Sequence, residues 1–376
     1  MKILYCLQST HNSGGMERIV ISKANKLANL GHLVYIVTNS QHDRNSFFKI
    51  EDRIKCIDLN INYDEIENES FLKKTLKYII KQIVHKNRLQ KVVSEVNPDI
   101  IISTYGYEIN FLHKLKTRAK KIAEIHFSKN FRKYRNRHGI WKLANRWLSY
   151  KSFKNINKYN AFVCLTKEDS ENWKGLSNLH VIPNFIEEKA KEAAPLNSKE
   201  VIAVGRLNYQ KGYDRMISIW KKVNEKYPEW KLRIYGNGEL KEELQDQIDK
   251  QGLSTCVELM SPVNDIYQRL LMSSIYIMTS RYEGLPMVLL EAMACGLPIV
   301  SFNCPCGPTD LLESSNAGFL VKDNDIDDFA NKIISLIENK HQRERIGAAA
   351  YRYADNFTAD IVINQWLSLF EDLLTT

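Results

Sequence analysis

The sequence lacks the long apolar runs that membrane-spanning helices need. No stretch of the 376 residues reaches the ~18 uninterrupted apolar residues of such a helix. The opening MKILYCLQST turns polar after a run no longer than a strand, so it does not predict a cleavable secretion signal. We therefore expect a cytoplasmic protein.

Cysteines are few and scattered. The chain has seven, at positions 6, 56, 164, 256, 295, 304 and 306. An odd number without regular spacing is the reverse of a secreted disulfide framework and predicts reduced thiols. The close pair Cys304 and Cys306 lacks the second pair or nearby His that a tetrahedral zinc site needs, so we expect no metal site.

Glycine and proline are too few for a collagen-like or disordered chain. The sequence has 16 Gly and 9 Pro, with 44% hydrophobic and 26% charged residues, as in ordinary globular proteins. No internal repeat or low-complexity segment is present. The length is that of two domains.

Charge is unevenly distributed along the chain. Residues 1–200 carry 35 Lys and Arg against 20 Asp and Glu, whereas residues 201–376 carry 18 against 24. Residues 111–158 hold 15 basic residues and one acid, Glu124, interleaved with aromatic residues. Because each Lys or Arg near an anionic leaflet contributes ~1 kcal/mol and aromatic rings suit the interface, this segment predicts peripheral docking on a membrane.

Two other interpretations of the basic segment fit its composition. A solvated basic helix pair over a buried aromatic stripe would have the same composition. Nucleic-acid binding is a different functional class that basic, aromatic surfaces permit, but no recognised binding motif appears in the sequence. We therefore expect no nucleic-acid partner.

Short apolar runs alternate with helical patterns along the chain. Ile3–Leu7 predicts a buried strand, apolar residues between Met16 and Leu30 recur at helical spacing, and Leu33–Thr38 predicts the next strand. Further strands are expected at residues 100–103, 121–126, 161–165, 201–204, 231–235, 256–259, 275–278, 298–301 and 318–321. This order predicts an α/β fold with parallel sheets.

The polar, small-residue stretch at 186–199 predicts a linker. We therefore expect an N-terminal Rossmann-like domain over residues 1–190 and a second doubly wound domain over 198–358. The amphipathic residues 359–376 form a final helix that packs back on the N-terminal domain or on the second domain.

A basic loop follows the strand expected at 201–204. Parallel sheets bind ligands at the carboxyl ends of their strands, where helix N-termini attract anions. In Gly205-Arg206-Leu-Asn-Tyr-Gln-Lys211-Gly212, two cations converge on a position that suits a diphosphate. A solvated basic loop is the alternative.

Two acids follow the strand expected at 275–278. Pro286 suits the first turn of a helix, which places Glu283 in the preceding loop and Glu291 near the middle of the helix. Carboxylates spaced this way can accept hydrogen bonds from sugar hydroxyls in one groove. Otherwise Glu291 would be a solvated helix residue and Glu283 a partner of the helix dipole.

Backbone groups at three loops are further candidates for ligand binding. Glycine lets the backbone approach a phosphate or sugar closely, and free N–H groups at a helix start can hold their oxygens; for the first loop a plain turn is the alternative. The candidate residues are Gly14 and Gly15, Gly236, Asn237 and Gly238, and Gly284, Leu285 and Pro286, apart from the proline nitrogen.

Asp323-Asn-Asp325 has the Asp-x-Asp pattern that binds a metal ion in some enzymes. These acids precede an amphipathic run from Phe329, where they would stabilise a helix N-terminus. We therefore do not expect them to bind a metal.

As a set, these motifs resemble the donor site of family 4 retaining glycosyltransferases, which have the GT-B fold. The resemblance spans most of residues 201–325. It is carried by Gly205-Arg206-x4-Lys211-Gly212, Gly236-Asn-Gly238, and Glu283-Gly-x-Pro with Glu291-Ala-Met-Ala-x-Gly296-x-Pro298, and Gly14, Gly15 and His126 extend it to the first domain.

The resemblance implies two Rossmann-like domains that face each other across a cleft, with the donor on the second and the acceptor on the first. Arg206 and Lys211 would bind the donor diphosphate, Glu291 the ribose, and Glu283 the transferred sugar. Backbone groups of 284–286 would assist Glu283, and Gly14 and Gly15 would meet the diphosphate. His126 would lie beside the sugar, although a core or strand-end histidine is the alternative.

The family's chemistry retains the anomeric configuration and needs no protein nucleophile, metal or cofactor. Catalysis would then consist of stabilising the departing diphosphate and positioning the substrates. Cys304-Pro-Cys-Gly307-Pro308 departs from the commoner acidic form, and it is similar to members that transfer hexoses or N-acetylhexosamines from UDP-sugars to surface-polysaccharide or glycolipid intermediates. A lipid-linked or glycan acceptor would follow. A nucleotide-sugar epimerase or hydrolase of the same fold is the alternative.

Overall fold

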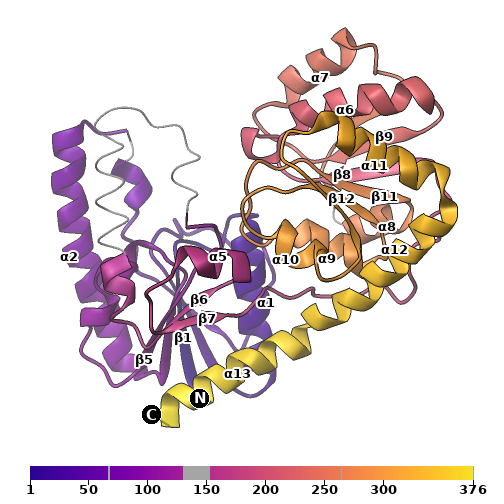
Figure 1. Cartoon of the computed structure of the whole chain (residues 1–376). Coiled ribbons are helices and arrows are strands. Elements are labelled where there is room, and N and C mark those ends of the chain that lie inside the picture. The colour runs from indigo at the N-terminus through magenta and orange to yellow at the C-terminus, as the bar shows by residue number, and fades with distance from the viewer. Residues whose placement is uncertain (67, 130–152, 264, 376) are drawn as a thin grey trace. The chain divides into compact units, whose positions relative to one another are not determined.

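The computed structural model describes residues 1–66, 68–129, 153–263 and 265–375 (Figure 1). The chain divides into two compact units, each built on a parallel sheet. The N-terminal unit comprises Met1–Leu165, Ser170–Ile182 and Val362–Thr376, and the second unit comprises Thr166–Asp169 and Pro183–Ile361.

The N-terminal unit contains a seven-stranded sheet in the order β3-β2-β1-β4-β5-β6-β7, and all pairs are parallel. Its strands are β1 (Lys2–Leu7), β2 (Leu33–Thr38), β3 (Lys55–Asp58), β4 (Ile100–Ser103), β5 (Lys120–Glu124), β6 (Ala161–Cys164) and β7 (Leu179–Val181). Its longer helices are α1 (Gly15–Asn29), α2 (Phe71–Val96) and most of α13 (Ala359–Thr375), and α5 (Lys167–Asn172) begins in the second unit.

The second unit contains a six-stranded parallel sheet in the order β10-β9-β8-β11-β12-β13. Its strands are β8 (Glu200–Val204), β9 (Lys231–Tyr235), β10 (Val257–Met260), β11 (Ile275–Met278), β12 (Ile299–Phe302) and β13 (Gly318–Val321). Its helices are α6 (Tyr213–Lys226), α7 (Lys241–Lys250), α8 (Ile266–Leu271), α9 (Met287–Ala294), α10 (Pro308–Leu312), α11 (Ile326–Glu338) and α12 (Lys340–Tyr353).

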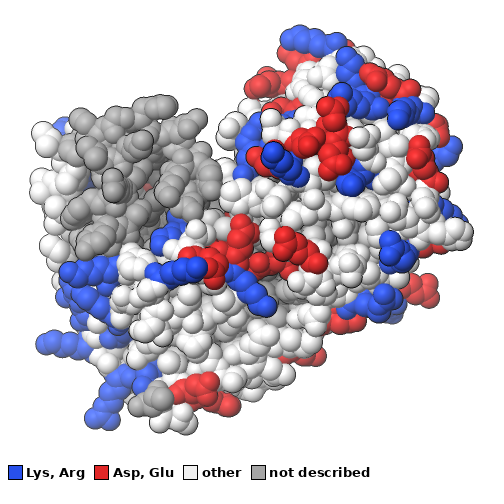
Figure 2. Space-filling view, in the orientation of Figure 1, with Lys and Arg blue, Asp and Glu red and all other residues white. Residues whose placement is uncertain are grey.

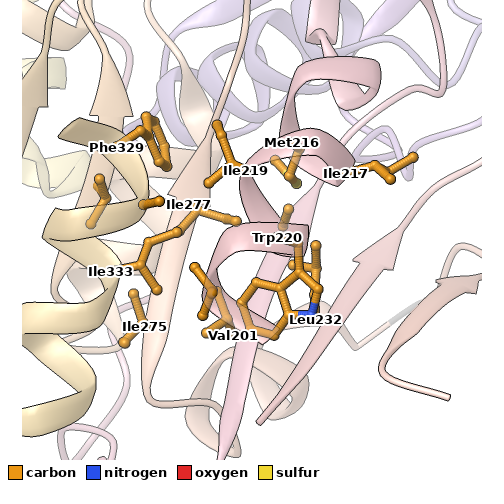
Figure 3. Close-up of a cluster of buried hydrophobic side chains, with 14 of the residues drawn as sticks. Val201, Met216, Ile217, Ile219, Trp220, Leu232, Ile275, Ile277, Phe329 and Ile333 are labelled. Carbon is orange, nitrogen blue, oxygen red and sulfur yellow. The ribbon is translucent and has the colours of Figure 1, made fainter. Parts of the chain in front are cut away.

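A continuous apolar core joins the sheet of the second unit to its helices. Trp220 of α6 lies among strand residues such as Val201 and Leu232, while Phe329 and Ile333 of α11 pack near Ile277 (Figure 3). All six side chains are almost fully buried. Burial of a large apolar side chain contributes about 1.5–3 kcal/mol, so this core fixes the sheet that carries the loops described below.

In both sheets the strand order reverses beside the first strand of the unit. The reversal lies between β1 and β4 in the N-terminal unit and between β8 and β11 in the second. Ligands of doubly wound sheets bind in the crevice at such a reversal, outside the carboxyl ends of the strands. The structure thus confirms the α/β fold with two doubly wound parallel sheets.

The sequence patterns did not predict β3 or the bounds of α2. β3 is an edge strand of four residues, Lys55–Asp58, whose side chains are largely exposed, so it shows no apolar alternation. Helix α2 carries several of its large apolar residues on an exposed face, which hides the usual buried stripe. No helix in the described ranges is long and apolar enough to cross a bilayer.

Candidate functional site

The basic loop, residues 205–212, leaves the carboxyl end of β8 and leads into α6. Arg206 is exposed, and its guanidinium has no hydrogen-bond or ion-pair partner among the described residues. The side chain of Asn208 caps the turn by accepting a hydrogen bond from the Lys211 N–H at 3.2 Å. The loop that carries Lys211 thus also carries an exposed cation without a partner among the described residues.

The acidic loop, residues 279–286, leaves the carboxyl end of the neighbouring strand β11 and leads into α9. Lys211 Nζ lies 2.7 Å from Glu283 Oε1, and the two side chains are only 18% and 8% exposed. These residues are 72 positions apart in the sequence and meet because β8 and β11 are neighbours in the sheet. The structure thus brings together Lys211, which is predicted to bind the diphosphate, and Glu283, which is predicted to bind the sugar.

Arg281 and its partners fasten the acidic loop to the basic loop. The Arg281 guanidinium forms two hydrogen bonds with Asp214, at 2.6 and 3.0 Å, and one with the Tyr209 carbonyl at 2.7 Å. Gln210 Nε2 donates to the Tyr282 carbonyl at 3.0 Å. A bidentate arginine pair restricts both loops, which reduces the reorganisation needed when a ligand binds.

A second arginine holds the same loops from within. Arg215 donates to the Thr279 carbonyl at 2.5 Å and to Asp323 Oδ1 at 2.7 Å, and its guanidinium lies 4.6 Å from the centre of the Phe302 ring. Thr279 Oγ1 in turn donates to the Gly212 carbonyl at 2.9 Å. Sequence reasoning missed Arg215 and Arg281, because nothing in their local sequence indicates which loops they join.

Glu291 and Glu283 lie near the same buried tyrosine. Both carboxylates are almost fully buried, at 4% and 8% exposure. Burial raises the pKa of Tyr276 well above its usual value, and Tyr213, Glu291 and Glu283 add to this effect. Both acids thus lie close enough to Tyr276 to affect its pKa, and a groove shared by the two carboxylates stays a prediction.

Gly236 and Gly238 serve chain packing in this structure. A Cβ on Gly236 would lie 1.9 Å from the Gly205 carbonyl oxygen, and one on Gly238 would lie 2.2 Å from the Leu207 carbonyl oxygen. Asn237 continues this contact because its carbonyl accepts the Leu207 N–H at 2.9 Å. The space that these glycines leave is filled by the basic loop, and their part in donor binding stays a prediction.

The cysteine loop, residues 303–307, supports the acidic loop. The Glu283 N–H donates to the Pro305 carbonyl at 3.0 Å. Gly307 has a φ of 101°, and a Cβ there would lie 2.4 Å from Cδ of Pro286 and 2.7 Å from the Gly284 carbonyl oxygen. Burial and the charge of Glu283 raise the pKa of the Cys304 thiol, so this cysteine is a buried neutral group behind the acidic loop.

Backbone donors are available at the start of α9. Pro286 caps the helix, and Leu285 is 7% exposed. The N–H groups of Gly284 and Leu285 have no hydrogen-bond partner within the described part of the chain. Their predicted part in holding phosphate or sugar oxygens stays a prediction.

In the N-terminal unit, Gly14 and Gly15 precede or begin α1 at the reversal point of the sheet. A Cβ on Gly15 would meet no atom within 4 Å, while one on Gly14 would meet the flexible Glu17 carboxylate. Gly15 therefore leaves open space on the side where a ligand of this sheet is expected.

His126 lies two residues beyond the carboxyl end of β5. Its side chain is 3% exposed, and its Nε2 lies 2.8 Å from Oε1 of Glu124. Glu124 also pairs with Lys23, a buried lysine of α1 that sequence reasoning did not identify. His126 thus belongs to a charged cluster at the carboxyl ends of the strands of the N-terminal sheet, where ligands of such sheets bind.

The Asp-x-Asp residues have structural roles. Asp325 caps α11 by accepting the Asp328 N–H at 3.0 Å, as predicted, and Asp323 pairs with Arg215. Within the described ranges, no cluster of three His, Cys, Asp or Glu residues could hold a metal ion. The seven cysteines, all of them among the described residues, form no disulfide bond.

Two family models match this chain, one in each half. The model described as Glycosyltransferase Family 4 matches residues 13–189, and the model described as Glycosyl transferases group 1 matches residues 184–353. The second match contains the basic, acidic and cysteine loops.

Relatives of similar length align with nearly the whole chain. An uncharacterized glycosyltransferase of Haemophilus influenzae is 29% identical over 373 residues, which are 97% of this chain and 98% of the relative. The lipopolysaccharide 1,6-galactosyltransferase of Salmonella typhimurium is 24% identical over 375 residues, covering 94% of this chain and 95% of the relative.

The fold is also that of solved glycosyltransferase structures. Anabaena HepE, solved in complex with UDP and glucose, superposes with a TM-score of 0.75 at 18% identity and covers 99% of both chains. Because the two family models together span most of the sequence and the folds agree over the full length, this chain is a member of the family 4, group 1 glycosyltransferases and has the GT-B fold.

Proposed function

We propose that this glycosyltransferase moves a hexose or N-acetylhexosamine from a UDP-sugar to a hydroxyl of a glycan or lipid-linked acceptor, with retention of configuration and without a metal ion. The observation that carries the proposal is the pairing of Lys211 with Glu283 at the reversal point of the second sheet, where the loop of Lys211 also carries the exposed Arg206.

The donor would be held by the three loops of the second unit. Arg206 and Lys211 would bind the diphosphate, because an ammonium has three protons and can contact both Glu283 and a phosphate oxygen. Glu283 and the N–H groups of Gly284 and Leu285 would bind the transferred sugar, and Glu291 the ribose. UDP is favoured because Anabaena HepE, which shares this fold, was solved with UDP and glucose.

Transfer would depend on stabilising the leaving diphosphate. As the glycosidic bond to UDP breaks, negative charge grows on the phosphate oxygen, and two cations near that oxygen lower the barrier. A phosphate oxygen of the departing UDP would take the proton of the acceptor hydroxyl on the same face of the sugar, so no protein nucleophile is needed. The N-terminal unit would bind the acceptor.

A role in surface-polysaccharide or glycolipid synthesis fits the comparisons. The Salmonella typhimurium relative is described as a lipopolysaccharide galactosyltransferase, and the match covers nearly the whole length of both chains. We therefore place the acceptor of this enzyme among the growing glycans or lipid-linked intermediates of such a pathway.

A thermal-shift screen with nucleotide sugars tests the donor. UDP-sugars are expected to raise the melting temperature more than GDP-mannose does, because a ligand that binds only the native state stabilises it. Each stabilising donor is then incubated without acceptor. Rapid epimer formation or stoichiometric hydrolysis would indicate the epimerase or hydrolase and would contradict transfer.

Membrane docking of the N-terminal unit is the second part of the proposal. Residues 130–152 of the basic segment lie outside the described residues, but α2 offers independent support. Its large apolar side chains at i, i+4, i+7, i+8 and i+11 share one face and are 52–79% exposed. They are Leu72, Leu76, Ile79, Ile80 and Ile83.

Charge favours an anionic bilayer as the partner of this α2 face. Lys73 and Lys77 lie beside the apolar residues, and α2 has no acid before Glu95. Figure 2 shows that most charged side chains along the outer edge of this unit, on the face in view, are Lys or Arg. A helix with an apolar face and basic flanks binds in the plane of an anionic membrane.

Vesicle sedimentation tests this docking. We expect the protein to sediment with phosphatidylglycerol vesicles at low salt and less at high salt, and not with phosphatidylcholine vesicles. Leu76→Asp/Ile80→Asp should abolish sedimentation, whereas Met272→Asp, which alters a residue 62% exposed in the second unit, should not. Equal failure of the wild type to bind at both salt concentrations would rule the docking out.

A further inference from the structure

Lys23 and Glu124 form a fully buried charge pair in the N-terminal unit. Nζ of Lys23 lies 2.5 and 2.6 Å from the two carboxylate oxygens of Glu124, and each side chain is 1% exposed. Apolar residues of similar volume often stabilise a protein as well as a buried ion pair does, because the pair must lose its hydration. Stability alone is therefore a weak explanation for this pair.

The pair is continued by His126. Nε2 of His126 lies at the ion-pair distance of 2.8 Å from Oε1 of Glu124. Both ring nitrogens are buried, and neither has a partner with hydrogen-bond geometry within the described part of the chain. A carboxylate at Nε2 favours the ring form that carries its proton there. In the neutral ring, Nδ1 is then left as a hydrogen-bond acceptor.

The C-terminal helix completes the environment of Lys23. Its Nζ lies 3.8 Å from the ring centre of Trp366 on α13 and 5.6 Å from that of Tyr5 on β1. Trp366 is 2% exposed, so its indole covers the ammonium group and shields it from water. The helix that carries Trp366, α13, is labelled in Figure 1. A cation over an indole face is stabilised more strongly when the site is desolvated.

These contacts keep Glu124 ionised although it is buried. Burial opposes ionisation, but the charge of Lys23 and the interaction with the His126 ring outweigh it and lower the pKa of Glu124 to about 2. Glu124 is therefore a carboxylate at neutral pH, as the contact with Nε2 of His126 requires. Without Lys23 the carboxylate would lose its main compensating charge.

The position of His126 just beyond β5 indicates the chemical role of the cluster. The residue follows β5 at the carboxyl edge of a doubly wound sheet, where such sheets bind ligands. A buried nitrogen without a partner at that edge is costly unless a ligand satisfies it. A sugar hydroxyl can donate the missing hydrogen bond.

We propose that Lys23 and Glu124 are positioning residues that fix the His126 ring with its proton on Nε2, so that Nδ1 accepts a hydrogen bond from a substrate hydroxyl. Trp366 keeps Lys23 in place, which makes the C-terminal helix part of the site's support. The inference rests on the proposed function, in which His126 lies beside the transferred sugar.

Ring-nitrogen NMR tests the positioning without requiring turnover. Protein with 15N-labelled histidine reports which nitrogen carries the proton, and the His126 signals are identified by their loss in His126→Asn. The informative variant is Lys23→Met/Glu124→Gln, which removes both charges at nearly constant volume and so avoids an unpaired buried charge. Lys121→Met is the matched control, because the ammonium of Lys121, on the same strand, donates to the Leu115 carbonyl at 2.9 Å and not to Glu124.

At pH 8 we expect the wild type and Lys121→Met to carry the His126 proton on Nε2 and the double variant to show both tautomers. Its kcat for sugar transfer should fall about 100-fold, because a displaced catalytic group costs about that much, with little change in KM for the UDP-sugar. Trp366→Phe should retain more activity than Trp366→Leu, since only the former keeps a ring over Lys23.

An unchanged His126 tautomer in a folded double variant would overturn the inference. A changed tautomer with wild-type kcat would also overturn it, because positioning would then have no effect on transfer. If the wild type turns over none of the UDP-sugars, the proposed function fails, but the NMR spectra still decide whether Lys23 and Glu124 set the state of His126.

Discussion

Replacing Lys211 or Glu283 by alanine is expected to abolish sugar transfer. Loss of Lys211 removes a cation from the leaving diphosphate, and a single preorganised group of this kind contributes about 10²–10³-fold to kcat. Loss of Glu283 removes the carboxylate that would hold the sugar and frees Lys211 from its 2.7 Å contact. UDP release from UDP-sugar plus acceptor measures the effect.

Binding of UDP should separate the two roles. Lys211→Ala is expected to weaken UDP binding, measured by calorimetry, whereas Glu283→Ala should leave it nearly unchanged because Glu283 would contact only the sugar. Glu283→Gln and the double variant Lys211→Met/Glu283→Gln guard against loss of the fold from an unpaired buried charge. Lys222→Ala is the control, since Lys222 pairs with Asp327 on the surface of the same unit. Near-normal turnover of both alanine variants would refute the site.

The fold was readable from the sequence wherever a strand is buried on both faces. β1, β4 and β11 are continuous apolar runs, and their positions were predicted to within one residue. β3 was missed because an exposed edge strand needs no such run. The order of strands in each sheet was not readable, because short parallel strands of similar composition do not specify their neighbours.

The candidate site was predictable residue by residue but not as an arrangement. Motif spacing indicated Lys211 and Glu283 separately, whereas their contact depends on β8 lying beside β11. Lys23 gave no signal, because a lysine in an amphipathic helix is normally exposed. The sequence predicts that Gly236 lets the backbone approach a ligand, whereas in the structure it lets the backbone approach the Gly205 carbonyl. The sequence does not distinguish the two, because both close approaches require glycine.

Gly212→Ala is expected to disturb the site from outside the ligand contacts. Gly212 has a φ of 65°, and a Cβ there would lie 2.2 Å from the Thr279 carbonyl oxygen, which also accepts the Arg215 hydrogen bond. Relief of that contact must move the basic loop away from the acidic loop. Because Lys211 precedes Gly212, its separation from Glu283 should change as well.

Gly252 offers a matched control for this substitution. It has a φ of 71° at the end of α7, but a Cβ there would meet no atom within 4 Å. Gly252→Ala should therefore lower the free energy of unfolding only by the roughly 1–2 kcal/mol of a left-handed residue and leave transfer unchanged. Gly212→Ala should lower it further and reduce kcat by about 100-fold, as expected for displaced catalytic groups. Urea unfolding and steady-state kinetics compare the two variants. If both variants lose the same stability and keep the same activity, the Gly212–Thr279 contact does not hold the two loops together. The rigid sheet would then not determine the position of the Lys211–Glu283 pair through this contact.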